Sequence, residues 1–442
     1  MNVNRKLLQV LILLAALFFL DTWHPAYAIP SFARQTGYPC TACHTIYPQL
    51  TPLGRQFKLN GYTDGTQDLV KQISAWLQTS YTHTSKDQTS APAPHFSTND
   101  NLALDQASLF FGGKIADKVG AFLQGTYDGV GRQWTWDNMD VRFANQATLA
   151  GKALVYGLSL NNNPSVEDLW NTTPAWSYPF DSSAVARGPA AATLIEGGLG
   201  QIAAGGSAYA MWGQSVYLET GLYHTLSTGA IRSLGGDPGG TPSSDGVAPY
   251  WRFAYEKQFG ASDLSVGTFG LTARLYPGRD QSMGSDRFTD VGIDARYQWT
   301  GARDNVTARF SVIHEKQNLP ASFALGDAAN PSNRLQSLNT SITYTYDQTL
   351  GFTASVGHLW GKADPALYGT TTGSPATTSL TFQVDWLPLN KKPIEWYPWF
   401  NPKFTAQFVH FTRLDGSTAN TDGAGRNASD DDAIFLLTTF TF

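Results

Sequence analysis

The sequence predicts an all-β protein, a transmembrane antiparallel β-barrel of about sixteen strands with a small helical segment before it. Three observations lead to this fold class. Beyond the N-terminal leader there is no long uninterrupted apolar run, so a barrel is the remaining way for the mature chain to cross a bilayer. From about residue 72 onward, segments of roughly ten residues alternate apolar and polar side chains. Short and long connections alternate between these segments, as in bacterial outer-membrane barrels.

Composition agrees with a barrel and excludes one class of partner. Aromatic residues make up 13% of the chain and charged residues only 15%, and aromatic-rich alternation is typical of barrel girdles. The formal net charge is −5, so the chain lacks the basic surface that nucleic-acid binding needs. We therefore expect lipid, and no nucleic acid, among its partners.

The N-terminus has the pattern of an export signal, which we assign to residues 1–28. Arg5 and Lys6 form a basic start, Leu7 to Leu20 is an apolar run, and Ala26-Tyr27-Ala28 offers a small-residue cleavage site. An uncleaved membrane anchor is the alternative, but the apolar run is shorter than the ~20 residues that a spanning helix needs. We expect cleavage after Ala28.

The two cysteines of the chain lie in the motif Cys40-Thr41-Ala42-Cys43-His44, which has the c-type haem attachment spacing. Two thiols at this spacing meet two vinyl groups on one porphyrin edge, and the adjacent imidazole reaches the iron from one face. We predict one covalently bound haem c, held through Cys40 and Cys43, with His44 as an axial ligand of the haem iron.

Three other interpretations of the motif compete with haem attachment. Half of a zinc site would need a second ligand pair nearby, and a redox-active dithiol would need a βαβ setting that this region does not show. A plain disulfide between Cys40 and Cys43 stays open in an oxidising compartment.

The residues after the motif are expected to form a helix that packs on the haem. Leu50, Leu53 and Phe57 fall at helical spacing, and Gly61 is a plausible stop. Arg55 and Lys58 are candidates to pair with haem propionates, and a solvated polar face is the alternative.

The second axial ligand is not supplied locally, because residues 45 to 82 contain no Met or His. The segment from 29 to 70 is also too small to enclose a porphyrin by itself, so we expect it to lie inside the barrel lumen. The remaining candidates for the second ligand are His83, His95, His224, His314, His358, His410, Met139, Met211 and Met283.

The barrel is assigned to residues 71–442, and two segments show its alternation most clearly. Leu380, Phe382, Val384 and Trp386 are expected to face lipid, with Thr381, Gln383 and Asp385 facing the lumen. Val291, Ile293, Ala295, Tyr297 and Trp299 repeat the pattern against Asp290, Asp294, Arg296 and Gln298. At the C-terminus Ile434, Leu436, Phe440 and Phe442 share one face, and a last strand ending in Phe resembles outer-membrane assembly signals.

The lengths of the connections between strands predict how the barrel is oriented in the membrane. Short turns are expected near Ala116 to Lys118, Gly213, Gly260 to Ser262, Gly301 to Asp304 and Gln348. Long loops cover Lys86 to Asn101, Asn162 to Gln201, Ser227 to Gly246, Asn318 to Asn333, Lys362 to Thr377 and Asp415 to Ser429. Short turns face the periplasm in such barrels, so both termini are expected on the periplasmic side of a Gram-negative outer membrane. The stretch Pro388 to Asn401 is long where a short turn is expected.

The chain resembles the fused monohaem cytochrome-porins of iron-oxidising bacteria. The resemblance is specific at Ile29 to Gly37, at Cys40 to His44, at Leu50 to Arg55 and at Gly61-Tyr62, and weaker over Trp386 to Phe400 and Asp430 to Phe442. Members of that family are regarded as outer-membrane ferrous-iron oxidases. The resemblance thus implies an Fe(II) oxidase that passes electrons to a periplasmic cytochrome or copper protein.

Two other functions stay open. The same parts running in reverse would export electrons to external acceptors, and a diffusion porin would use the haem segment only as a gate or sensor. Acidic loop residues Asp237, Asp245, Asp327, Asp422 and Asp430 to Asp432 are candidates to attract Fe(II), because oxygen ligands suit hard cations. Solvation of the loops is the simpler interpretation of those residues.

Overall fold

The computed structural model describes residues 30–390 and 399–442. The signal peptide at 1–28, its cleavage site and most of the Pro388 to Asn401 stretch lie outside the described residues. Among the described residues, no helix is both long and apolar enough to cross a membrane.

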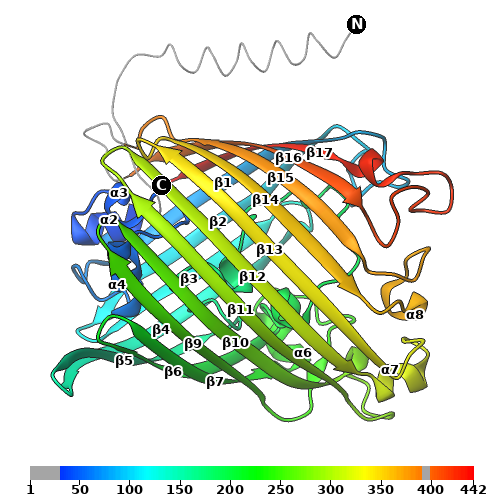
Figure 1. The fold of residues 1–442 in the computed structure, drawn as a ribbon, viewed down its shortest axis with the longest axis horizontal. Helices are drawn as coiled ribbons and strands as arrows, with labels where there is room; N and C mark the ends of the chain where they lie inside the picture. Colours follow the sequence, from blue (N-terminus) through cyan, green and yellow to red (C-terminus); the bar gives the residue numbers. More distant parts are fainter. Residues whose placement is uncertain (1–29, 391–398) are drawn as a thin grey trace, which may run out of the picture.

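The fold is a closed antiparallel β-barrel of sixteen long strands, as the sequence predicts (Figure 1). They are β1 (Ile73–Thr84), β2 (Asn101–Ala116), β3 (Val119–Asp128), β4 (Gln133–Leu149), β5 (Lys152–Asn161), β6 (Ala203–Trp212), β7 (Val216–Thr225), β9 (Ala248–Phe259), β10 (Ser262–Tyr276), β11 (Asp286–Thr300), β12 (Asp304–Asn318), β13 (Ser332–Tyr346), β14 (Leu350–Gly361), β15 (Thr377–Trp386), β16 (Asn401–Arg413) and β17 (Ala433–Thr441). A two-residue strand, β8 (Ser243–Ser244), adds to the end of β10. Pairing of β1 with β17 closes the ring and leaves no edge strand.

The strands face lipid and lumen as the alternation predicts. In β11, Val291 and Ile293 are exposed on the outer face, whereas Asp290, Asp294 and Arg296 are buried on the inner face. In β15, Phe382, Val384 and Trp386 are exposed, and Thr381, Gln383 and Asp385 are buried. Ile434, Leu436 and Phe442 are likewise exposed at the C-terminus. An apolar exterior around a polar interior is the arrangement of an outer-membrane barrel.

The connections separate into two edges. Every predicted short turn is confirmed, and together they define a short-turn edge, where β1 also begins and β17 ends. The opposite, long-loop edge carries the predicted long loops, with helices α6 (Thr228–Ser233), α7 (Pro320–Leu325) and α8 (Pro365–Tyr368) in three of them and one turn of helix, η4 (Ala428–Asp431), in a fourth. Two connections on that edge are shorter, residues 129–132 and residues 277–285, which include η3 (Pro277–Arg279).

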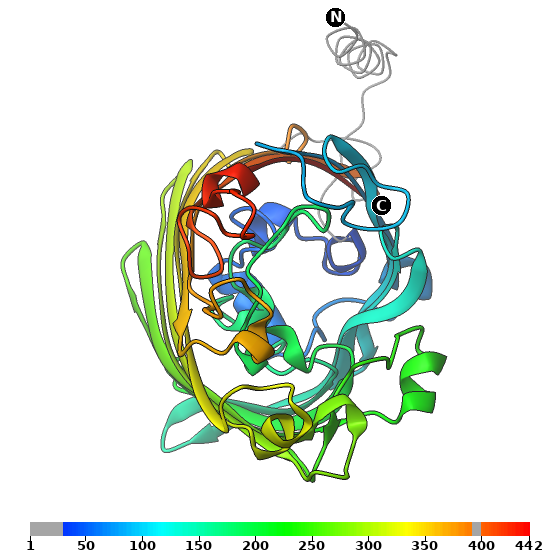
Figure 2. The ribbon, with the colours of Figure 1, turned by 90° about the vertical axis from the view of Figure 1, so that its right-hand side faces the viewer.

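Among the described residues, four short helices come before the barrel: α2 (Pro30–Thr36), α3 (Cys40–Cys43), α4 (Pro52–Leu59) and α5 (Leu69–Gln72). We call residues 30–72 the plug. Figure 2 looks into the barrel along the strands and shows these blue helices within the ring.

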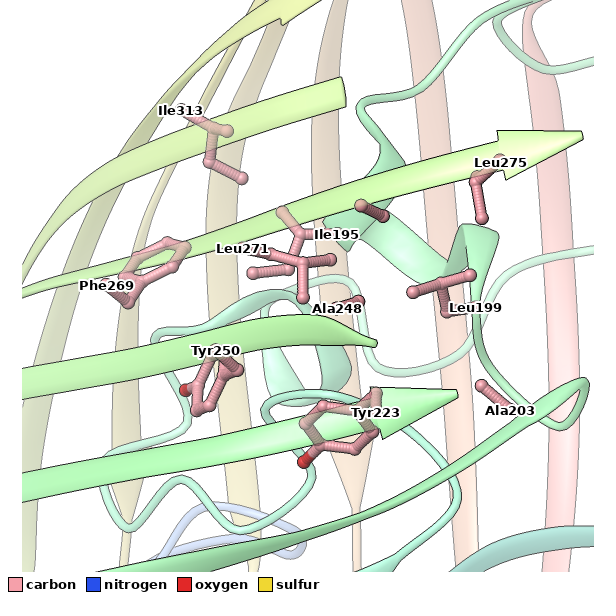
Figure 3. Close-up of a cluster of buried hydrophobic side chains, with 11 residues drawn as sticks. Ile195, Leu199, Ala203, Tyr223, Ala248, Tyr250, Phe269, Leu271, Leu275 and Ile313 are labelled. Carbon is pink, nitrogen blue, oxygen red and sulfur yellow. The ribbon is translucent and has the colours of Figure 1, made fainter. Parts of the chain in front are cut away.

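The connection between β5 and β6, residues 162–202, also lies inside the ring; we call it the inner loop (Figure 2). Its turns η1 (Pro174–Trp176) and η2 (Leu194–Gly198) are short, and Ile195 and Leu199 are almost fully buried. Figure 3 shows these two side chains packed against Tyr223, Tyr250 and Leu271 of β7, β9 and β10. The expectation that residues 162 to 201 form an exterior loop is therefore wrong, because their apolar side chains are buried against the inner wall.

Candidate functional site

The Cys40–His44 motif forms a single helical turn near the start of the plug. Cys40 and Cys43 are the first and last residues of α3, and the backbone N–H of His44 donates to the Cys40 carbonyl (2.8 Å). Cys40 is buried and Cys43 is half-buried, and no disulfide joins the two residues. The disulfide that the sequence left open is thus not formed in this structure.

The environment of Cys43 also weighs against a reactive dithiol. Burial, with a smaller contribution from Asp64, raises the pKa of the Cys43 thiol to about 11. A redox-active cysteine pair needs a lowered pKa, since the thiolate is the nucleophile. Of the three interpretations that compete with haem attachment, the redox-active dithiol has the least support in the structure.

Helix α4 is built directly onto the motif. Thr51 donates its backbone N–H to the Cys43 carbonyl (2.9 Å) and its hydroxyl to the Ala42 carbonyl (2.5 Å), and its side chain caps the helix by accepting from Gly54. A Cβ at position 54 would overlap the Cys43 carbonyl oxygen, so the close approach requires glycine. The helix begins at Pro52, two residues after Leu50, and Gly61 follows its C-cap with a φ of +69°, as expected for a helix stop.

The wall of the barrel holds the other side of the motif. Gln348, in the turn between β13 and β14, donates its amide to the carbonyls of Thr41 (2.7 Å) and His44 (2.9 Å). Gln49 donates to the Thr343 hydroxyl of β13 (3.0 Å). Because residue 348 belongs to a short turn, these contacts place His44 at the short-turn edge.

The residues around the motif fit a covalently bound porphyrin. Nδ1 of His44 is buried without a hydrogen-bond partner, and neither Cys40 nor Cys43 is in a disulfide. Tyr38, two residues before Cys40, is 40% exposed, and Leu53, in the helix that packs on the motif, is 41% exposed. Pro39 and Pro52 beside them are exposed as well. An apolar group bound here would cover surface that otherwise stays in contact with water.

Arg55 and Lys58 have partners that the sequence did not predict. Arg55 pairs with Glu256 of β9 (2.7 Å) and Asp263 of β10 (3.0 Å). Lys58 donates to two carbonyls of the inner loop, those of Val166 (2.7 Å) and Asp168 (2.6 Å). The expectation of a solvated face is wrong, since both side chains are buried. Binding of propionates would require them to leave these partners.

A second set of buried charges fixes the far end of the plug. Arg142 of β4 pairs with Asp140 (2.7 Å) and donates to the carbonyls of Lys58 (3.2 Å) and Glu167 (2.8 Å). Tyr62 donates its hydroxyl to Asp140 (2.7 Å). The strand, the plug and the inner loop therefore meet at one guanidinium.

The inner loop is anchored to the wall in the same way. Asp168 pairs with Arg252 of β9 (3.1 Å), which also pairs with Asp294 of β11 (2.9 Å). Trp170 donates its indole N–H to Glu256 (2.6 Å), the carboxylate that also binds Arg55. The plug and the inner loop thus share wall residues. The sequence predicted inward charges on β11 but offered no signal for these partners.

The five candidate histidines on strands lie far from His44. His83, His224, His314, His358 and His410 all sit close to the long-loop ends of β1, β7, β12, β14 and β16. His314 is ten residues along β12 from the short-turn edge, about 25 Å at the usual rise and tilt of a barrel strand. His95 belongs to the loop between β1 and β2. Strand geometry thus separates these imidazoles from the motif.

The methionine candidates are no closer. Met139 alternates with inward Asp140 and so faces outward, and Met283 is exposed in a connection at the long-loop edge. Met211 faces inward but packs on Leu59 and Trp170, and its strand β6 lies nearly half-way round the ring from β13 and β14. Among the described residues, no predicted candidate for the second axial ligand lies beside His44.

The acidic loop candidates for Fe(II) mostly have internal partners. Asp430 pairs with Lys86 (2.7 Å), Asp431 with Arg426 (2.8 Å), and Asp432 with His410 (2.6 Å). Asp245 pairs with Arg274 (2.9 Å). In the part of the chain that the structure describes, no group of three or more His, Cys, Asp or Glu side chains is placed to hold a metal ion.

No protein-family model and no curated protein matches the sequence. Among solved structures, the chain is similar to the anion-selective porin from Comamonas acidovorans, at 11% identity and a TM-score of 0.46, over 84% of this chain and 98% of the porin. The outer-membrane channel DcaP of Acinetobacter baumannii gives 11% and 0.45, over 84% and 96%. The trimer form of OmpT from Vibrio cholerae gives 9% and 0.45, over 84% and 98%.

Likeness at this level does not assign a function, so the class of protein rests on the barrel itself. Its sixteen strands close without an edge, its outer face is apolar, and its inner face carries buried charges. These features define a porin-like outer-membrane β-barrel.

Proposed function

We propose that this chain is an outer-membrane cytochrome-porin that binds one haem c through Cys40, Cys43 and His44 and passes electrons across the membrane. The donor is extracellular Fe(II), and the acceptor is a periplasmic cytochrome or copper protein. One observation carries the proposal: two cysteines one helical turn apart that form no disulfide, followed by a histidine, lie on a peptide held inside a membrane-spanning barrel. The choice of Fe(II) as the electron donor rests, in addition, on the resemblance to the cytochrome-porin family.

A haem bound at this motif supplies a one-electron redox centre. The residues of the chain keep that centre in one place. Gln348 and Thr51 hold both sides of the Cys40–His44 turn, and Arg55 ties the following helix to two wall carboxylates. Leu53 and Tyr38 offer apolar contact surface.

The position of the motif determines which redox partner comes close to the proposed haem site. His44 lies at the short-turn edge, which we assign to the periplasm together with both ends of the mature chain. A periplasmic acceptor would then approach the motif from nearby, whereas the mouth of the barrel that faces outside lies across most of the ~25 Å apolar band. The apolar outer face of the wall separates the relay from lipid.

Rigid anchoring of the plug favours a fixed relay over a movable gate. Arg55 and Lys58 are buried and bonded to the wall and the inner loop, and Arg142 of β4 binds the plug from another part of the wall. Opening a gate would break these buried contacts together, which is costly. Equal liposome swelling by this barrel and an ordinary porin would instead favour a diffusion function.

The test is to express the chain with c-type maturation machinery and mix its oxidised form anaerobically with Fe(II). We expect the haem absorption bands to become reduced. If dithionite reduces them while Fe(II) leaves them oxidised, the iron-oxidase function is wrong. The haem potential and the direction of electron transfer in whole cells separate iron oxidation from electron export, which uses the same parts in reverse.

A further inference from the structure

Arg309, on the inner face of β12, is a buried cation without a hydrogen-bond or carboxylate partner among the described residues. It is 5% exposed, and its Nε, Nη1 and Nη2 atoms are all buried without a hydrogen-bond acceptor. Other buried arginines of the described wall and plug behave differently, since Arg55, Arg142, Arg252 and Arg296 each pair with at least one carboxylate. A guanidinium buried without a counter-charge is unfavourable, and proteins neutralise such groups.

Two aromatic rings of the inner loop cover Arg309 but do not neutralise it. The guanidinium carbon lies 4.7 Å from the ring centre of Phe180 and 5.6 Å from that of Tyr178. Cation–π contacts of this kind favour the positive charge of the guanidinium, yet they accept none of its five N–H bonds. The rings therefore enclose a site that still needs an acceptor.

Arg309 is one of the residues that line a small cavity. Its volume is about 10 Å³, which holds one water molecule or one small monatomic ion. Besides Arg309 and Tyr178, polar side chains of β12, β13 and the inner loop line it: Ser311, Ser341, Asn339, Asn171, Thr172 and Ser177. No carboxylate is among them, so the site is positive overall and offers hydroxyl donors.

We propose that this cavity binds a single halide ion, chloride under ordinary conditions, with Arg309 as the charged ligand. A neutral water would leave the buried charge uncompensated, and phosphate, sulfate or a carboxylate has too many heavy atoms for the volume. The proposal is independent of the haem, because it rests on the charge and size of this cavity.

The anion site connects the inner loop to the haem peptide. Asn171, which lines the cavity, donates its amide to the Pro48 carbonyl in the turn after His44 (3.1 Å). Asn339 donates to the Tyr178 carbonyl and so ties the same loop to β13. A halide beside Arg309 therefore stabilises the docked inner loop and, through Asn171, the turn that carries His44.

Crystals of the full-length barrel soaked in bromide test the site directly, because bromide replaces chloride and gives an anomalous signal. We expect a peak beside the Arg309 guanidinium in the wild-type protein. A map with a water there and no bromide peak at saturating bromide overturns the proposal. This measurement needs no variant that has to fold.

Thermal unfolding in detergent gives a second test. At constant ionic strength, replacing gluconate by chloride is expected to raise the unfolding temperature of the wild type by several degrees, because the ion binds only the folded state. Arg309→Gln should abolish the rise. Arg274→Gln, at an exposed arginine paired with Asp245, is the matched control and should keep it. An equal chloride effect in Arg309→Gln and the wild type contradicts the proposal.

Discussion

The two ends of the barrel differ in the chemistry they place near the lumen. The short-turn end holds the Cys40–His44 turn of the plug, where Gln348 donates to the carbonyls of Thr41 and His44. The long-loop end carries all the strand histidines, several of them bonded to loop or strand residues such as Asp432. This separation indicates that the haem iron, if bound as proposed, draws one protein ligand from the plug and none from the histidines of the wall.

The largest expected effect comes from removing the attachment residues at the short-turn end. The double variant Cys40→Ala/Cys43→Ala should lose all covalent haem, measured by haem staining after denaturing electrophoresis, because no other cysteine exists in the chain. Thr41→Ala, between the cysteines, is the control and should keep the stain. Since the barrel does not depend on these thiols, the double variant should still assemble, seen as heat-modifiable migration. Haem staining in the double variant would show that the attachment site is wrong.

A large stability effect is expected where the plug meets the wall. Arg55→Ala leaves Glu256 and Asp263 buried near each other with one cation fewer. Removing one partner of a buried ion pair costs about 3–5 kcal/mol of unfolding free energy, measured by urea titration. Lys71→Ala, which removes an exposed pair with Asp68, should cost about 0–1 kcal/mol. Equal effects of the two variants would mean that Arg55 does not anchor the plug.

A smaller effect is expected at the contact between α3 and α4. Gly54→Ala places a methyl group against the Cys43 carbonyl and should displace α4, at about 1–3 kcal/mol for overpacking. We expect a lower haem content per barrel than in the wild type. Gly125→Ala on β3, where a Cβ meets no atom, should leave haem content unchanged. A haem content equal to that of the wild type in the Gly54 variant would show that α3 and α4 accommodate the added methyl group without loss of haem binding.

The smallest effect is expected at the long-loop end. Single replacement of His83, His224, His314, His358 or His410 by Ala should leave the haem absorption spectrum unchanged, because these side chains lie far from the short-turn edge. A shifted Soret band in one variant would identify that histidine as a haem ligand and contradict the separation of the two ends.

Period-two alternation predicted the wall well, because each strand residue must face either lipid or lumen. The faces of β11 and β15, the sixteen strands and the short turns all followed from it. The same pattern says only that Asp294 or Glu256 points inward and gives no information on its partner. Those partners, Arg252 and Arg55, come from strands and segments far apart in sequence.

The position of the inner loop also could not be predicted from the sequence. Residues 162 to 201 are rich in the Pro, Ser, Asn and Gly typical of exterior loops, yet they fold inward. Their burial depends on the packing of Ile195 and Leu199 against an apolar patch on the inner wall. Tyr223, Tyr250 and Phe269 form that patch. That patch exists only once β7, β9 and β10 are paired. For the motif, spacing alone identified Cys40, Cys43 and His44, while their haem stays a prediction.

The most direct measurement of the central claim is the haem content of the chain in isolated outer membranes, from cells with c-type maturation machinery. We predict one haem per barrel that resists extraction by acidified acetone and gives the pyridine haemochrome spectrum of thioether-linked haem. Absence of such a pigment from correctly assembled barrels, or recovery of the chain as a soluble periplasmic protein, would contradict the account.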